Sequence, residues 1–130
     1  MMTNQKIDTI VREFADEIKE ASLGYWEFIY KGQFILAITD ESHNRMRLIS
    51  PVIASKKVNN KTLKICMEAN FDRALDARYA ISGDYLWSAF IHPLGELGDT
   101  QFVDAMNQVA TLAMNYGGSY TSTDLLFGGQ

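Results

Sequence analysis

The chain has 130 residues, of which 47% are hydrophobic and 22% charged, and its formal net charge is −4 at pH 7. These values are typical of one soluble globular domain. We expect residues 1–117 to form that domain and residues 118–130 to be a flexible C-terminal tail. No apolar run approaches the roughly 18 residues of a membrane span, so no membrane partner is predicted. A single cysteine, Cys66, and the lack of a signal peptide favour the cytoplasm.

The acidic net charge argues against general nucleic-acid binding, but it conceals a local excess of basic residues. No acidic residue occurs between positions 45 and 64. This basic block consists of Arg45, Arg47, Lys56, Lys57, Lys61 and Lys64. It is either a solvated surface without a partner or a surface that steers an acidic partner, or a second copy of the chain, onto one side.

The first half of the chain predicts a helix and three strands. Apolar residues recur at helical spacing from Ile7 to Ala21, and Gly24 is a natural stop for this helix. Aromatic and branched side chains then predict two strands joined by Lys31-Gly32, followed by a third strand that carries the two arginines on one face. The predicted elements are helices at 4–22, 61–73 (capped by Asn60) and from Asp99 or Thr100 to 116, and strands at 25–30, 33–39, 45–53, 77–82 and 85–92.

The second half is organised around a hairpin with Gly83-Asp84 at its tip. Because Gly tolerates positive φ, this pair suits a two-residue turn, which fixes the register of the two strands. Ile81 should therefore lie opposite Leu86, Tyr79 opposite Ser88 and Ala77 opposite Phe90. The following helix has one apolar stripe and should pack on that side of the hairpin.

The other side of this hairpin is the candidate partner surface. Tyr85, Trp87 and Ile91 make it as apolar as the core side, with Arg78 beside them. Either another element of the same chain covers it, or it is a surface for a second copy or another protein, because aromatic residues beside arginine are typical of interfaces. Trp26 and Phe28 form a second candidate surface of the same kind.

No catalytic, cofactor or metal signature was found. His43 and His92 lack neighbouring ligands at metal-binding spacing, and Cys66 lies among apolar residues as a small buried side chain would. Nucleophile and phosphate-loop motifs are absent. We therefore expect no enzyme and no cofactor. Leu125 to Phe127 form a small apolar segment in the tail that could dock on the domain or on a neighbour.

The predicted order α-β-β-β-α-β-β-α indicates an α+β fold, an antiparallel sheet with helices packed against it. The segment from Ala77 to Ala113, with Gly83-Asp84, Leu86-Trp87 and His92-Pro93-Leu94, resembles the YbjN-like families, which share the fold of type III secretion chaperones. This resemblance spans roughly residues 4–117. It implies a small acidic homodimer that binds a protein or an extended peptide and performs no chemistry.

Two functions are thus carried forward from the sequence. The first is a non-enzymatic homodimeric protein-binding module that uses the Trp87 side of the hairpin. The alternative is a regulatory protein whose basic block binds an acidic partner or nucleic acid, the latter being disfavoured by the net charge.

Overall fold

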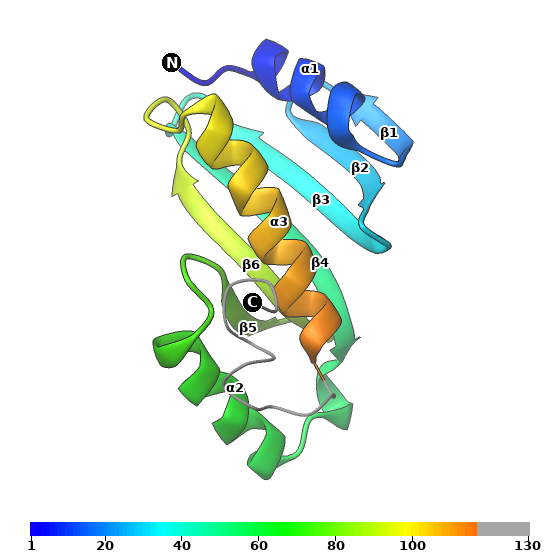
Figure 1. Cartoon of the computed structure of the whole chain (residues 1–130), viewed down its shortest axis with the longest axis vertical. Helices are drawn as coiled ribbons and strands as arrows, with labels where there is room; N and C mark the ends of the chain where they lie inside the picture. The colour runs from blue at the N-terminus through cyan, green and yellow to red at the C-terminus, as the bar shows by residue number, and fades with distance from the viewer. Residues whose placement is uncertain (117–130) are drawn as a thin grey trace.

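The computed structural model describes residues 1–116, which form one six-stranded antiparallel sheet and three α-helices (Figure 1). The predicted α+β class is confirmed, whereas the expected tail at 118–130, including Leu125 to Phe127, lies outside the described residues. The elements are α1 (Asn4–Phe14), β1 (Glu17–Ser22), β2 (Tyr25–Tyr30), β3 (Gln33–Asp40), β4 (Arg45–Ala54), the short 3-10 helix η1 (Ser55–Lys57), α2 (Asn60–Asp72), β5 (Arg78–Ser82), β6 (Tyr85–Pro93) and α3 (Asp99–Asn115).

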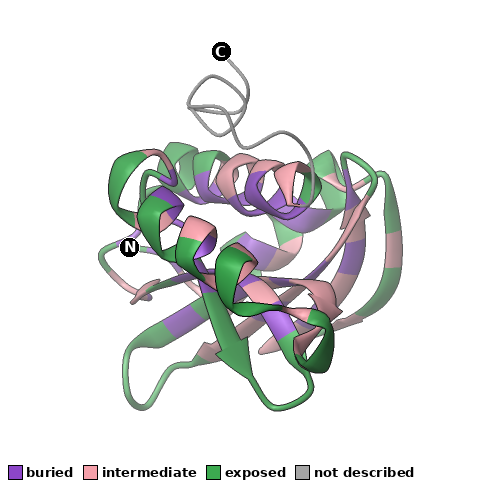
Figure 2. Ribbon diagram, turned by 90° about the horizontal axis from the view of Figure 1, so that it is seen from below, coloured by how far each residue is buried: buried purple, intermediate pink, exposed green. Residues whose placement is uncertain are grey.

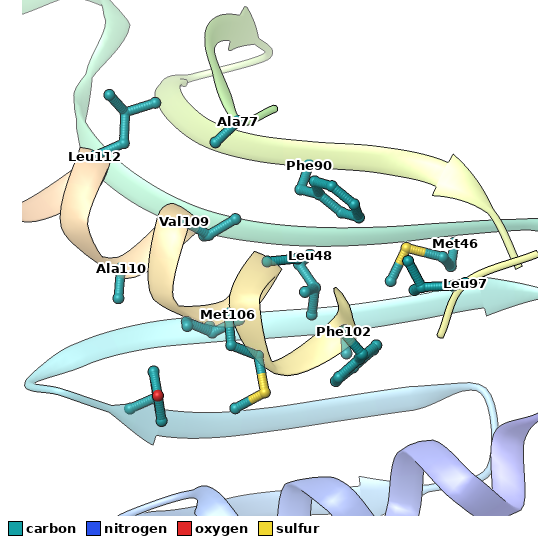
Figure 3. Packing of buried hydrophobic residues seen from close by; sticks show 14 of the residues in the cluster. Met46, Leu48, Ala77, Phe90, Leu97, Phe102, Met106, Val109, Ala110 and Leu112 are labelled. Atoms are coloured by element: carbon teal, nitrogen blue, oxygen red, sulfur yellow. The ribbon is translucent and has the colours of Figure 1, made fainter. Parts of the chain in front are cut away.

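The strands lie in the order β1-β2-β3-β4-β6-β5, so β4 and β6 are neighbours although α2 and β5 separate them in the chain. α3 lies over this sheet (Figure 1) and buries its predicted apolar stripe against it. Figure 3 shows Phe102, Met106 and Val109 of α3 packed over Leu48 of β4 and Phe90 of β6. The main core is therefore the space between α3 and one face of the sheet.

Side-chain hydrogen bonds tie α1 and α3 to that same face. Trp26 Nε1 donates to Asp8 of α1 at 3.0 Å, and Tyr79 Oη donates to the Leu112 carbonyl of α3 at 2.7 Å. Ser88 Oγ donates to the Val109 carbonyl at 2.9 Å. These bonds satisfy polar atoms that burial would otherwise leave unpaired. Figure 2 shows α3 lying over one side of the sheet, and Figure 1 shows α2 at the end of the sheet beside β5.

The first helix is shorter than predicted, and the structure adds a strand. α1 ends at Phe14, and β1 pairs with β2 across a bulge between Ile18 and Glu20. The extra residue of the bulge lets Ile18 and Ala21 face the same side of the sheet although they are three apart. That spacing also continues a helical stripe, which is why residues 17–22 were misassigned.

The hairpin formed by β5 and β6 has the predicted register. Tyr79 pairs with Ser88 and Ile81 with Leu86, and Gly83 has a φ of 59°, as the turn requires. β5 begins at Arg78, one residue later than expected, so Ala77 lies just outside it. A local two-residue turn thus specifies the strand alignment without help from the rest of the fold.

Candidate functional site

The side of the sheet opposite α1 and α3 carries no helix within residues 1–116, and we call it the helix-free face. Strand alternation places apolar side chains on both faces of the central strands. One row runs through the paired residues Glu27, Leu36, Ile49, Ala89 and Arg78, from β2 to β5. A parallel row joins Ile38, Arg47 and Ile91. The first row is therefore aliphatic in the middle with a charge at each end, whereas the second row has Arg47 between two isoleucines.

An aromatic pair lies at one end of the helix-free face. The rings of Tyr85 and Trp87 meet edge to face with centroids 5.6 Å apart, and Trp87 Nε1 donates to the Ser82 carbonyl at 3.0 Å. Tyr85 is 46% exposed and Ile91 is 52% exposed. The sequence left two alternatives for this surface, burial under another element of the chain or contact with a partner. Within residues 1–116 no other element of the chain covers it. The hydrogen bond and the ring contact favour one orientation of the Trp87 side chain, which lowers the entropy cost of using it in binding.

Arg78 lies at the β5 margin of the helix-free face, opposite Ala89. Its guanidinium donates to the backbone carbonyls of Leu75 and Ala77, the latter at 2.7 Å. These bonds hold together the turn that leads into β5. Arg78 therefore has a structural role in addition to its position beside Trp87's strand.

Trp26 and Phe28 are not surface residues, which corrects the second candidate surface. Both have 0% exposure, because they point from β2 toward the helices rather than toward the helix-free face. The hydrogen-bonded ion pair with Arg12 and, to a smaller extent, the bond from Trp26 hold the pKa of Asp8 below its ordinary range. In β2 it is Tyr25, Glu27 and Ile29 that reach the helix-free face. Apolarity alone did not separate the two sets, because Tyr25 and Ile29 are as apolar as Trp26 and Phe28; the charge of Glu27 was the one signal that its set faces solvent.

The basic block is split by the fold. Arg45 and Arg47 lie at the start of β4 on the helix-free face, as their alternation with Met46 and Leu48 predicted. Lys56 and Lys57 lie in η1, beyond the other end of β4. At 3.3 Å per residue, β4 separates the two pairs by roughly 30 Å. Lys61 and Lys64 belong to α2. The six residues thus form separate groups rather than one continuous patch.

A tyrosine hydroxyl and a carboxylate on the helix-free face form a hydrogen bond with each other. Tyr25 Oη donates to a carboxylate oxygen of Glu27 at 2.5 Å. This hydrogen bond, with a smaller effect of burial, raises the pKa of Tyr25 to about 12. Glu27 therefore has its hydrogen-bond partner in its own strand.

A second apolar surface, which the sequence reasoning missed, lies on α2. Phe71 is 92% exposed and Met67 is 48% exposed. They are four residues apart and so are neighbours on the helix surface, and we call them the α2 pair. The weak signal that could have revealed this surface is the four-residue spacing of Met67 and Phe71 on the side away from Cys66 and Ala69.

The described residues contain no group of three His, Cys, Asp or Glu side chains that could hold a metal ion. His43 Nδ1 lies 2.8 Å from Asp40 in an exposed turn, where Ser42 also bonds to Asp40. His92 stacks on Phe90, and its Nδ1 lies 2.8 Å from the Pro93 carbonyl. Both histidines have local structural partners. Within residues 1–116 no helix is long and apolar enough to cross a membrane.

Comparison with solved structures identifies the fold. A chain of the HopA1–SchA chaperone–effector complex is 12% identical, with a TM-score of 0.62 over 86% of this chain and 90% of that one. The Yersinia pestis type III secretion chaperone SycH, in complex with a stable fragment of YscM2, is 12% identical, with a TM-score of 0.61 over 88% and 98%. The ExsC–ExsE complex gives 10% identity and a TM-score of 0.60 over 85% and 86%.

No protein-family model and no curated protein matches the sequence. The structural likeness nevertheless shows that this chain has the fold of type III secretion chaperones, as the resemblance predicted. At these identities the likeness establishes the fold, and function must be argued from the surfaces.

Proposed function

We propose that this chain is a non-enzymatic, homodimeric protein-binding module that holds an extended segment of a partner protein on its helix-free face. The observation that carries the proposal is the aliphatic and aromatic surface around Trp87, Tyr85 and Ile91, which no element of residues 1–116 covers. Large exposed apolar patches mark interaction sites. Their contact with water is unfavourable, and binding a partner removes that contact.

The comparisons support a protein partner at the level of the fold. HopA1–SchA is a chaperone–effector complex, and SycH was solved with a fragment of YscM2 bound. The narrower resemblance to YbjN-like families stays a prediction. The absence of a catalytic constellation in the sequence is consistent with a binding role.

We assign self-association to the α2 pair. Phe71 projects almost entirely into solvent, and Met67 beside it enlarges the apolar area. A two-fold dimer places the same surface on both partners, so one exposed apolar ridge is sufficient to make an isologous contact. This arrangement leaves the helix-free face available to a different protein.

The proposal is tested by selecting peptides from a random display library on the purified chain and comparing two substitutions. Ile91→Ala and Ile81→Ala remove the same side chain at nearly equal exposure, 52% and 50%, from opposite faces of one hairpin. Ile91→Ala should reduce peptide recovery, whereas Ile81→Ala should not. Trp87→Ala should weaken binding of a selected peptide by about 2 kcal/mol, as expected for a hot spot. Equal loss in Ile81→Ala would contradict the use of this face, and absence of any selected peptide would contradict the function.

The alternative, a regulatory protein that binds an acidic partner or nucleic acid through the basic block, draws support from Arg45 and Arg47. Both are exposed, and neither forms an ion pair within residues 1–116. Under this alternative, Arg47→Glu and Lys57→Glu should both abolish binding, and affinity should fall steeply with salt. Binding that is insensitive to salt and to Lys57→Glu would exclude it.

A further inference from the structure

On the helix-free face most acidic side chains have bonding partners, whereas two arginines do not. Arg47 lies between Ile38 and Ile91 in the cross-strand register, with no acidic side chain beside it. Arg45 lies opposite Asp40, but no ion pair joins them. Asp40 instead accepts hydrogen bonds from Ser42 Oγ at 2.8 Å and from the His43 backbone N–H at 3.1 Å. The two guanidinium groups therefore lack carboxylate partners within residues 1–116.

Most acidic side chains of the same face already have partners. Glu27 is bonded to Tyr25, and Glu17 pairs with Lys19 at 2.7 Å. Glu20 has no such partner, but it lies on β1, three strands away from β4, or about 14 Å at 4.8 Å per strand. If a second copy of the chain bound to this face, most of its carboxylates there would already be bonded to other side chains. A partner that satisfies the arginines must supply carboxylates of its own.

Both edges of the sheet are protected against pairing with another strand. Along β5, the Asn70 side chain bonds to the backbone N–H and carbonyl of Tyr79, at 2.7 and 3.0 Å. Along β1, a bulge and the exposed charges of Glu17, Lys19 and Glu20 oppose the addition of a strand. Binding through side chains on the face is therefore favoured over extension of the sheet.

Resting on the proposed function, we propose that the partner segment combines aliphatic side chains with carboxylates, the aliphatic groups packing around Leu36, Ile49 and Trp87 and the carboxylates meeting Arg45 and Arg47. An extended segment of about eight residues spans roughly 26 Å, which exceeds the width of the four strands from β2 to β6. Arginine suits this role because its planar fork binds a carboxylate through two parallel hydrogen bonds.

The apolar neighbours of Arg47 strengthen the effect. When a partner covers Ile38 and Ile91, water is excluded around the guanidinium and the attraction to a carboxylate increases. The same exclusion penalises a partner with a lysine or no charge at this position, because the arginine would then be covered without compensation. The face should therefore discriminate among apolar segments by their acidity.

The test uses a display library of random peptides about eight residues long, selected on three forms of the full chain. These are the wild type, Arg45→Glu/Arg47→Glu, and the matched control Lys56→Glu/Lys57→Glu, which makes the same charge change in the basic block beyond the other end of β4. All four residues are exposed, so the fold should be kept, and thermal unfolding would verify it.

Wild-type and control selections should both be enriched in peptides that combine Asp or Glu with Leu, Ile or Val. The Arg45→Glu/Arg47→Glu selection should shift to Lys and Arg. A synthetic acidic peptide from the wild-type selection should bind this variant at least about 10-fold more weakly.

Aliphatic peptides without an excess of acids, or an unchanged preference in Arg45→Glu/Arg47→Glu, would overturn the charge inference while the proposed function stands. If no form of the chain selects any peptide, both the charge inference and the proposed function are contradicted. Weaker self-association of Arg45→Glu/Arg47→Glu in sedimentation would assign the face to a second copy and also overturn the inference.

Discussion

Asn70 of α2 occupies the outer edge of β5 by binding both backbone groups of Tyr79. Its Oδ1 accepts from the Tyr79 N–H at 2.7 Å, and its Nδ2 donates to the Tyr79 carbonyl at 3.0 Å. One amide side chain thus takes the place that a residue of a neighbouring strand would have. It joins α2 to the sheet and closes an edge that could otherwise pair with another chain.

Asn70→Ala should lower the free energy of unfolding by about 1–3 kcal/mol, because it leaves two backbone groups of β5 without their partner. Urea denaturation measures this change. Asn70→Asp keeps an acceptor for the Tyr79 N–H but sets a carboxylate oxygen against the Tyr79 carbonyl, so it should also be destabilising at neutral pH if both bonds of the amide are needed. Equal stability of Asn70→Ala and the wild type would contradict this role.

Ser50 and Ser88 are cross-strand partners with opposite expected effects on stability. Both are fully buried; Ser88 Oγ donates to Val109, whereas Ser50 Oγ has no hydrogen-bond partner within residues 1–116. Ser88→Ala should cost about 1 kcal/mol. Ser50→Ala should be neutral or stabilising by up to about 1 kcal/mol, because it removes an unpaired buried hydroxyl. Thermal unfolding of the two variants side by side gives the sign, and a destabilised Ser50→Ala would disagree.

The two tryptophans should respond differently to solvent and to substitution. Trp26 is fully buried, whereas Trp87 lies on the helix-free face. An aqueous quencher should therefore quench the fluorescence of Trp26→Phe, which retains Trp87, far more than that of Trp87→Phe. Trp26→Ala should lower the free energy of unfolding by about 3–5 kcal/mol. Strong quenching of Trp87→Phe would indicate that Trp26 is not in the core.

Phe71→Asp should convert the proposed homodimer to a monomer without weakening the fold. The side chain is 92% exposed, so its loss removes few contacts within the chain. A charge at the centre of an apolar contact should cost at least about 2 kcal/mol of association, or roughly 30-fold in Kd. Sedimentation velocity at several concentrations measures this, with Lys61→Asp, at an exposed position ten residues before Phe71 in the same helix, as the control. A dimer that survives Phe71→Asp would assign self-association elsewhere.

Tyr25 should titrate well above an unperturbed tyrosine. Its hydrogen bond to Glu27 raises its pKa from 10.0 to about 12. Since the folded chain holds this proton more tightly, the contribution to stability is complete below pH 10 and is lost as the pH rises toward 12. Absorbance of the phenolate, with Tyr25→Phe as the reference, measures the pKa. Glu27→Gln should bring it closer to 10, and an unchanged pKa in that variant would contradict the assignment.

Local chemistry was sufficient for much of this fold. The Gly83-Asp84 turn specified the β5–β6 register because a two-residue connection leaves one alignment of the strands. The Phe102 to Val109 stripe specified α3 and its buried side. The alternation of Arg45 and Arg47 with Met46 and Leu48 specified that the arginines share a face. In each case, residues close together in the sequence were sufficient to predict the structure.

Other features depended on residues distant in the chain. Trp26 and Phe28 became core residues because α1 packs on their side of β2, and the alternative set at Tyr25 and Ile29 was equally apolar in sequence. The strand at 17–22 was concealed because its bulge reproduces helical spacing. The division of the basic block required the length and direction of β4.

The sequence by itself determined the α+β class, the hairpin and the apolar character of the Trp87 side. Only the tertiary structure decided that this side stays uncovered within residues 1–116, that two arginines there lack acidic partners, and that Phe71 projects into solvent. The physical reason is that hydrophobicity is a property of each residue, whereas burial depends on which elements pack against it, and those elements are brought together only by the fold.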